Sequence, residues 1–228
     1  QNSLEICIPF ISCPADLNED ESVGSFDLLV FLPFYGGDCE DYESLPDCEV
    51  TASPWMCGDL IEHDGYDYST VLIGEQCWFS ENCRYLPEVS PSSEGNTTDP
   101  YYYVYDYEGS DVGAAQATSN YANYGVLYNW PAVMTEGICP TSWHIPSDEE
   151  FTQLTDYLGG ESVAGDAMKS TSGWLDNQYD GSSGNGSNSS GFNGLPGGYK
   201  DVWGWEFRDM YSLVYFWSSY TNPNSEFL

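Results

Sequence analysis

Basic residues are almost missing from this sequence. Its 228 residues include 4 Lys and Arg against 37 Asp and Glu, and no cation precedes Arg84, so the formal net charge is -33. Phosphate binding needs clustered cations, so nucleic acid and anionic membrane surfaces are excluded as partners. The negative electric field of such a chain concentrates cations around it. The repulsion among its carboxylates also destabilises the fold, and salt or divalent ions such as calcium relieve that repulsion. We interpret the charge as a solvated surface suited to saline water.

Long apolar runs and metal-binding cysteine pairs are also missing. No apolar run reaches the roughly 20 residues that a membrane helix needs, so no membrane span is expected. The eight cysteines form no Cys-x-x-Cys pair, and only His63 and His144 could assist a zinc site. Disulfides formed in an oxidising compartment are therefore expected, with many connectivities open. The expected half-cystines are Cys7, Cys13, Cys39, Cys48, Cys57, Cys77, Cys83 and Cys139.

Aromatic residues, in contrast, are abundant. They make up 16% of the chain, with 19 Tyr and 8 Trp, and each ring buries a large area when it packs. Disordered acidic chains lack such residues, so this chain is expected to fold. Its length suits one large domain, or one domain with an appendage. The start at Gln1 fits a mature exported product, so a secreted or cell-surface protein is expected.

Residues 1–56 differ from the rest of the chain. They hold four cysteines, many carboxylates, no cation and two apolar stretches, 4–11 and 26–34. The second stretch predicts a strand that is apolar on both faces, so it needs cover on both sides. Either it docks on the main domain or it docks on another molecule. The residues expected to mediate such assembly are Phe26, Leu28, Leu29, Val30, Phe31 and Leu32.

Beyond residue 57, the clearest local signal is a helix start. Ser147 and Glu150 have the spacing of a capping box, and the apolar pattern that follows predicts a helix ending at Gly159. The other predicted elements are a strand over 68–73, helices over 125–134 and 163–169, a hairpin over 199–220, and long loops over 86–123 and 171–196.

Five sequence blocks resemble one bacterial domain family in their order and spacing. They are YSTVLIGEQCWFSENCRY (68–85), GVLYNWP (125–131), ICPTSWHIPSDEE (138–150), SGFNGLPGGY (190–199) and FWSS (216–219). Over about residues 57–220 the chain is similar to the Fibrobacter succinogenes major paralogous domain family. The resemblance implies an α+β, C-type-lectin-like fold, loop-rich and disulfide-stapled, distantly similar to formylglycine-generating enzyme domains. It predicts that this domain spans 57–228, after a β-rich, cysteine-containing segment over 1–56.

The resemblance also suggests where the protein acts and how its cysteines pair. Family members are exported by bacteria with large surface proteomes, and their biochemical roles are mostly unassigned. Cys83 stands where the family commonly has Leu, and we expect it to pair with Cys139, and Cys57 with Cys77. The other four cysteines would then close within residues 1–56. The tryptophans inside the blocks are expected in the core; they are Trp78, Trp130, Trp143 and Trp217.

No catalytic constellation is visible, so neither enzyme activity nor a cofactor is expected. Formylglycine-generating enzymes use a reactive cysteine pair that has no match here, which makes an oxidoreductase the least favoured alternative. His144 has no serine or cysteine nucleophile near it in the sequence, so a structural hydrogen bond is its expected role. The sugar-site signatures of calcium-dependent lectins are absent from the sequence as well.

Two further sets of residues are candidates for ligands or modification. Asp106, Glu108 and Asp111 place hard oxygen ligands close together, and calcium is the ion that would suit them. They lack the full calcium-loop pattern, so solvated loop charges are the preferred interpretation. The three Asn-x-Ser/Thr sequons lie in polar loops where such triplets also arise by chance. The candidate glycosylation sites are Asn96, Asn185 and Asn188.

Two functional hypotheses stand ahead of an enzyme. In the first, the chain is a structural protein of a bacterial surface or matrix, and residues 26–34 or 4–11 complete a sheet in a neighbouring copy. Such a head-to-tail contact does not close on itself and therefore builds a filament. In the second, loops 86–123 and 171–196 bind polysaccharide or another surface protein, since their Tyr, Ser, Gly and Asn resemble adaptable paratopes.

Overall fold

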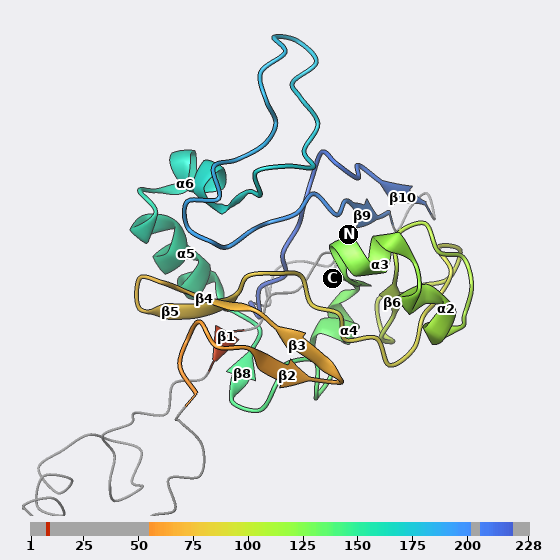
Figure 1. The fold of residues 1–228 in the computed structure, drawn as a ribbon. Helices are drawn as coiled ribbons and strands as arrows, with labels where there is room; N and C mark the ends of the chain where they lie inside the picture. Colours follow the sequence, from red (N-terminus) through yellow and green to blue (C-terminus); the bar gives the residue numbers. More distant parts are fainter. Residues whose placement is uncertain (1–7, 10–54, 202–205, 221–228) are drawn as a thin grey trace, which may run out of the picture. The chain divides into compact units, whose positions relative to one another are not determined.

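The computed structural model of the chain describes residues 8–9, 55–201 and 206–220 (Figure 1). The chain divides into two compact units, one of residues 1–9 and 57–228 and the other of residues 10–56. The predicted strand over 26–34, with its assembly residues, lies outside the described residues. So do four of the half-cystines, Cys7, Cys13, Cys39 and Cys48. The description below concerns the first unit.

The described part is an α+β structure with short antiparallel strands. β2 (Ile61–His63) pairs with β3 (Tyr66–Tyr68), and β4 (Thr70–Ile73) pairs with β5 (Gln76–Phe79). β6 (Tyr102–Tyr103) pairs with β7 (Leu127–Tyr128), and β9 (Tyr199–Lys200) with β10 (Phe207–Arg208). β1 (Ile8–Pro9) pairs with β8 (Trp143–His144). Every sheet within the described ranges has two strands, so loops and side-chain packing hold most of the chain in place.

The strand predicted over 68–73 is confirmed over residues 70–73, which form β4, while Tyr68 belongs to β3; the β4–β5 hairpin shows why β4 ends at Ile73. A two-residue turn joins Ile73 to Gln76, and its first residue, Gly74, has a φ of +64°. Glycine adopts this left-handed conformation without strain, and such turns match the twist of paired strands. The hairpin carries Trp78 and Phe79, which are both fully buried, into the core.

The helices are short, and the capping box is confirmed. α5 (Asp148–Tyr157) begins after Ser147, whose side chain accepts from the Glu150 N–H while the Glu150 side chain accepts from the Ser147 N–H. α6 (Glu161–Met168) is the helix predicted over 163–169. Figure 1 shows both helices on the same side of the unit as the β4–β5 hairpin. The remaining helices are α2 (Val112–Gln116), α3 (Ser119–Tyr124) and α4 (Trp130–Val133).

The helix predicted over 125–134 is wrong over its first half. Residues 127–128 form β7, and only Trp130–Val133 are helical. Gly125 has a φ of +71°, which is not a helical conformation, and a Cβ there would lie 2.4 Å from the Cys83 carbonyl oxygen. The chain therefore turns at Gly125, where the predicted helix would have to begin. Asn129 then caps α4, and the early position of Pro131 is one that helices tolerate.

The core is built from aromatic rings of several segments. Phe79 stacks on Tyr68 with ring centroids 4.4 Å apart, and its other neighbours include Trp143 at 4.8 Å. Trp78 contacts Phe151 of α5 and Phe192 of the following loop. Among the four tryptophans expected in the core, two are buried and two are half-buried against it; the half-buried pair is Trp130 and Trp217.

One predicted disulfide is confirmed and another is wrong. Cys57 and Cys77 form a disulfide that ties the start of the described domain to β5. Cys139 is disulfide-bonded to a partner other than Cys83. Cys83 is instead a fully buried thiol whose sulfur accepts from the Tyr128 hydroxyl at 3.3 Å. Cysteine often fills such core positions as a small apolar residue, and Cys83 packs in the core in this way.

Candidate functional site

The candidate functional site is the edge of β8, where the N-terminal strand β1 pairs. Ile8 lies opposite His144 and Pro9 opposite Trp143, in antiparallel register. β1 also lies against β5. In the sequence, residues 10–56 separate β1 from the rest of the first unit, and they belong to the other unit. A remote piece of chain therefore completes a sheet of the main unit.

The position of β8 is set by contacts that do not involve β1. The Trp143 N–H donates to the Pro140 carbonyl at 2.9 Å, which closes a turn just before the strand. Beyond the strand, the Pro146 carbonyl accepts from the Ser219 N–H at 2.8 Å. The Trp143 side chain, which is 8% exposed, packs on Phe79 in the core. β8 is thus anchored at both of its ends and by the Trp143 side chain, independently of β1.

His144 connects β8 to the start of α5. Its Nε2 lies 3.0 Å from Glu150 Oε1, while Glu150 Oε2 accepts from the Ser147 N–H at 2.7 Å. Burial raises the pKa of Glu150, but the hydrogen bonds from Ser147 and His144 outweigh it and hold this pKa below its ordinary value. The stabilisation is therefore present above the ordinary carboxyl pKa and is lost as the pH falls through the lowered value. His144 makes the structural hydrogen bond that was expected for it.

All four basic side chains make contacts inside the unit. Arg84 is buried, forms an ion pair with Glu81 at 3.2 Å and lies over the Tyr66 ring. Lys169 lies 4.2 Å from the Trp174 ring centroid and donates to the Gly184 carbonyl. The other two are Lys200, 1% exposed and 5.1 Å from the Tyr103 ring, and Arg208, which pairs with Asp201 and Glu206. The carboxylates thus dominate the exposed surface.

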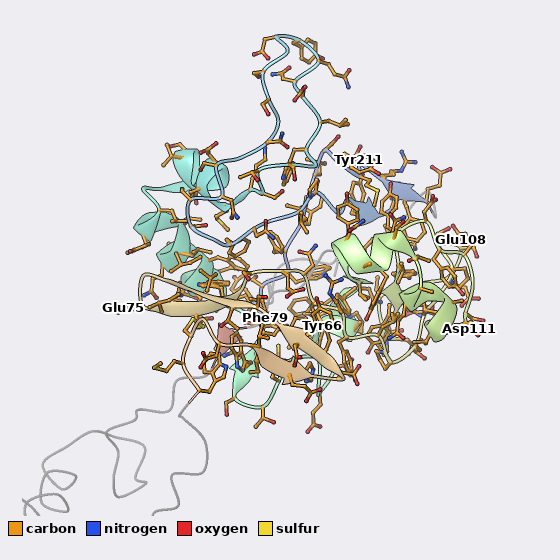
Figure 2. All side chains as sticks on the ribbon, in the orientation of Figure 1. Tyr66, Glu75, Phe79, Glu108, Asp111 and Tyr211 are labelled. Atoms are coloured by element: carbon orange, nitrogen blue, oxygen red, sulfur yellow. A yellow bond between two sulfur atoms is a disulfide. The ribbon has the colours of Figure 1, made fainter. Side chains whose placement is uncertain are left out.

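The residues considered for calcium do not form a site together. Asp111 caps α2 by accepting from the Ala114 N–H at 2.8 Å. Glu108 accepts from both the backbone N–H and the hydroxyl of Ser92, at 2.8 and 2.7 Å. Both lie at the edge of the unit near α2 (Figure 2). Among the described residues, no group of three acidic, His or Cys side chains is arranged to hold a metal ion.

The three sequon asparagines organise their own loops. Asn96 is exposed, and its Oδ1 accepts from the Thr98 and Asp99 N–H groups. Asn185 and Asn188 are half-buried, and their Oδ1 atoms accept from the N–H groups of residues 174 and 193. Of the three, Asn96 therefore has the side chain most open to modification.

No local pattern in the sequence predicts β8 as a strand. A two-residue strand leaves no alternation of apolar and polar residues to recognise, and Pro140 and Pro146 on either side favour the interpretation of a loop. The helix signal directly after it was read correctly, because the capping box is local.

Comparison with known proteins identifies the family. The Fibrobacter succinogenes major domain family matches residues 71–227, so more than half of the chain belongs to it. The chain is therefore a member of this family. No curated protein and no solved structure matches the chain. Within the described residues, no helix is long and apolar enough to cross a membrane.

Proposed function

We propose that this chain is a non-enzymatic, secreted structural protein of a bacterial surface or matrix, and that copies assemble head to tail by N-terminal strand exchange. The observation that carries the proposal is the pairing of β1 with β8. In an assembled filament, β1 of one copy would occupy the β8 edge of the next copy.

Strand exchange would keep the contacts of the closed form. The backbone pairing between β1 and β8 is the same whether both strands come from one copy or from two. Residues 10–56 lie between β1 and Cys57 and form a separate unit, so they are long enough to carry β1 to a neighbour. Because each copy would donate one strand and accept one, the contact is heterologous and continues into a fibre.

The charge of the chain would make this assembly sensitive to salt. Each copy adds a formal charge of -33, and the basic side chains are occupied by internal contacts. Neighbouring copies therefore repel one another at low ionic strength, and salt at about 0.15 M screens that repulsion beyond about 8 Å. Fibres should be longer at moderate salt, or with a divalent cation, than at low salt.

A cross-link across the β1–β8 pair tests this proposal. Ile8→Cys combined with His144→Cys places two thiols at directly opposed positions, where antiparallel strands accept a disulfide. If strands are exchanged, oxidation at moderate salt should give a ladder of covalent multimers on a non-reducing gel, and electron microscopy should show fibres. The single substitutions are the matched controls and should give no ladder. Cross-linked monomers alone, at every salt concentration, would show that the pairing stays within one copy.

An adhesive module is the second candidate function, and the loop over residues 174–186 favours it. In Figure 1 a loop of this part of the chain projects beyond α6. Tyr179 is fully exposed there, while Asn177 and Ser182 hold the loop through a backbone hydrogen bond of 2.8 Å. An ordered loop with an exposed Tyr is suited to contact a polysaccharide or another surface protein.

Substitution of the exposed tyrosine tests adhesion separately from assembly. Tyr179→Ser should lower binding on a glycan array, or to a surface-protein preparation, at least tenfold if the loop is adhesive. The unfolding midpoint should stay unchanged, because a fully exposed side chain contributes little to stability. Tyr157→Ser, at another exposed tyrosine, is the matched control. Equal binding by both variants would exclude the loop as the adhesive surface.

A further inference from the structure

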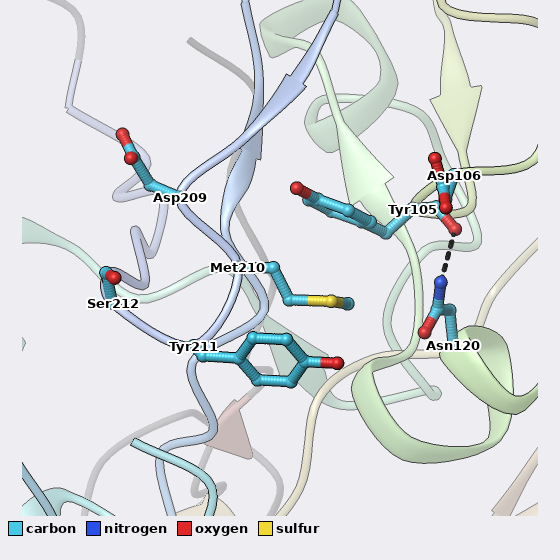
Figure 3. Close-up of a pocket in the computed structure, with 7 residues that line it drawn as sticks. All are labelled: Tyr105, Asp106, Asn120, Asp209, Met210, Tyr211 and Ser212. Atoms are coloured by element: carbon cyan, nitrogen blue, oxygen red, sulfur yellow. Dashed lines mark hydrogen bonds between the residues drawn. The ribbon is translucent and has the colours of Figure 1, made fainter. Parts of the chain in front are cut away.

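A pocket of about 650 Å³ opens on the surface of the unit, away from the β8 edge. Three stretches of chain form it: the segment after β6, the start of α3, and the turn after β10 (Figure 3). The residues that line it are Tyr105, Asp106, Asn120, Asp209, Met210, Tyr211 and Ser212. Neither the assembly site nor the projecting loop uses these side chains.

The walls of the pocket are fixed by backbone hydrogen bonds. Tyr211 donates its N–H to the Pro196 carbonyl at 2.9 Å and accepts from the Leu175 N–H at 2.8 Å. On the opposite wall, the Asn120 side chain donates to the Tyr105 carbonyl at 2.9 Å. Because both walls are anchored to the rest of the unit, a ligand would meet a formed pocket and would lose little affinity to ordering.

The pocket combines carboxylates with aromatic rings and has no basic residue in its lining. Asp106 and Asp209 are exposed to solvent, while Tyr105 is half-buried. Burial raises the pKa of the Tyr105 hydroxyl above its ordinary value, and the negative charges of Asp106 and Asp209 act in the same direction, against the opposing effect of a backbone hydrogen bond with Met210. Figure 3 shows the Met210 side chain between the rings of Tyr105 and Tyr211.

We propose that this pocket binds an organic cation, the amine or guanidinium group of a lysine or arginine side chain on a partner polypeptide. The two carboxylates attract the charge, and the Tyr211 ring, which is 44% exposed, adds a cation–π contact. A thioether such as that of Met210 adapts to the aliphatic stem of such a side chain. The whole surface favours the encounter, because the net charge of -33 draws cationic partners toward it.

A different polypeptide, and not a second copy of this chain, is the expected source of the cation. Each of the four basic side chains already pairs with a carboxylate or lies over an aromatic ring. Arg208 has a side chain that is 45% exposed, but it forms ion pairs with both Asp201 and Glu206. A copy would have to break these contacts to reach the pocket of another.

Nuclear magnetic resonance titration of the full chain tests this binding site. The probes are Nα-acetyl-lysine methylamide and Nα-acetyl-arginine methylamide, with methyl glucoside as the neutral comparison. We expect saturable shifts confined to residues 105–106, 120 and 209–212, with a dissociation constant near 1 mM (about 4 kcal/mol). The affinity should fall as salt is added, because the attraction is between exposed charges.

Paired substitutions separate a specific site from diffuse attraction. Asp106→Asn with Asp209→Asn should weaken binding of the amine probe at least fivefold. Both positions have positive φ, +63° and +55°, and Asn adopts that conformation as readily as Asp, so the backbone should be kept. Asp176→Asn with Asp180→Asn, on the projecting loop, removes the same charge and should leave binding unchanged.

Three results would overturn the proposal. Equal weakening by the two double variants would mean that the probe responds only to the general field of the chain. Shifts scattered over the surface, without saturation, would mean the same. Saturable binding of methyl glucoside with no response to either cation would assign the pocket to a neutral sugar instead.

Discussion

Replacing Trp78 with Ala is expected to lower the free energy of unfolding by about 3–5 kcal/mol. The Trp78 side chain is fully buried on β5 and contacts Phe151 of α5 at 5.3 Å and Phe192 at 5.8 Å between ring centroids. Its removal leaves a cavity where three remote segments meet, and short two-stranded sheets cannot easily move to fill it. Domains are stable by only about 5–15 kcal/mol in total, so the variant should be close to unfolding.

Chemical denaturation followed by circular dichroism measures this loss, with Leu72→Ala as the matched control. Leu72 lies on the partner strand β4 but is 59% exposed, so its truncation should change stability by about 0.5 kcal/mol or less. Trp78→Phe should cost less than Trp78→Ala, because Phe keeps most of the volume and the buried Nε1 of Trp78 has no hydrogen-bond partner among the residues that the structure describes. Similar losses for Trp78→Ala and Leu72→Ala would contradict the central packing role of this ring.

Replacing Asn129 with Ala is expected to cost about 3 kcal/mol or more. The buried Asn129 side chain accepts from the Tyr101 and Ala132 N–H groups, and it donates to the carbonyls of Asn96 and Asp99. It therefore caps α4 and holds the loop before β6 at the same time. Each hydrogen bond contributes about 1 kcal/mol, and the Ala132 N–H, whose bond to Asn129 is buried, would add to the loss when its acceptor is removed.

The variant Asn129→Asp separates the two halves of this network. Asp keeps the two acceptor contacts but brings a carboxylate against two carbonyl oxygens, so it should also destabilise near neutral pH. Protonation of that carboxyl restores one donor, so Asn129→Asp should recover part of its stability as the pH is lowered, whereas Asn129→Ala should not. Thermal unfolding at several pH values measures this difference. If Asn129→Ala unfolds at the wild-type midpoint, the four hydrogen bonds contribute no net stability.

Elements specified by neighbouring residues were predicted well. The capping box of Ser147 and Glu150 needs only residues three apart, and the glycines after α5 end that helix locally. The Cys57–Cys77 disulfide and the family membership were also correct, and they rested on resemblance to known sequence blocks. The related expectation of a C-type-lectin-like arrangement goes further than the α+β architecture that the strands and helices establish.

Elements specified by remote residues were predicted poorly. The segment after Gly125 looks helical, yet the Val126 N–H donates to the Cys83 carbonyl at 3.1 Å and the chain becomes β7. Asn129 could have been recognised as a helix cap from its place before Trp130-Pro131, but its bonds to the 96–101 loop have no local signature. Cys83 was expected in a disulfide because the number of cysteines is even and because it departs from the pattern of the resembling family, but neither observation says which sulfurs lie within bonding distance.

The residues of the sequence were enough to establish the strongly acidic surface and the start of α5, while the family and the α+β class came from its resemblance to known sequence blocks. Charge is a sum over residues, and caps and periodicity act over a few positions, so neither depends on how distant segments meet. The β1–β8 pair, the buried Cys83 thiol and the pocket between Tyr105 and Tyr211 needed the three-dimensional structure. Each joins segments far apart in the chain through packing and backbone hydrogen bonds, and no local pattern records which segments those are.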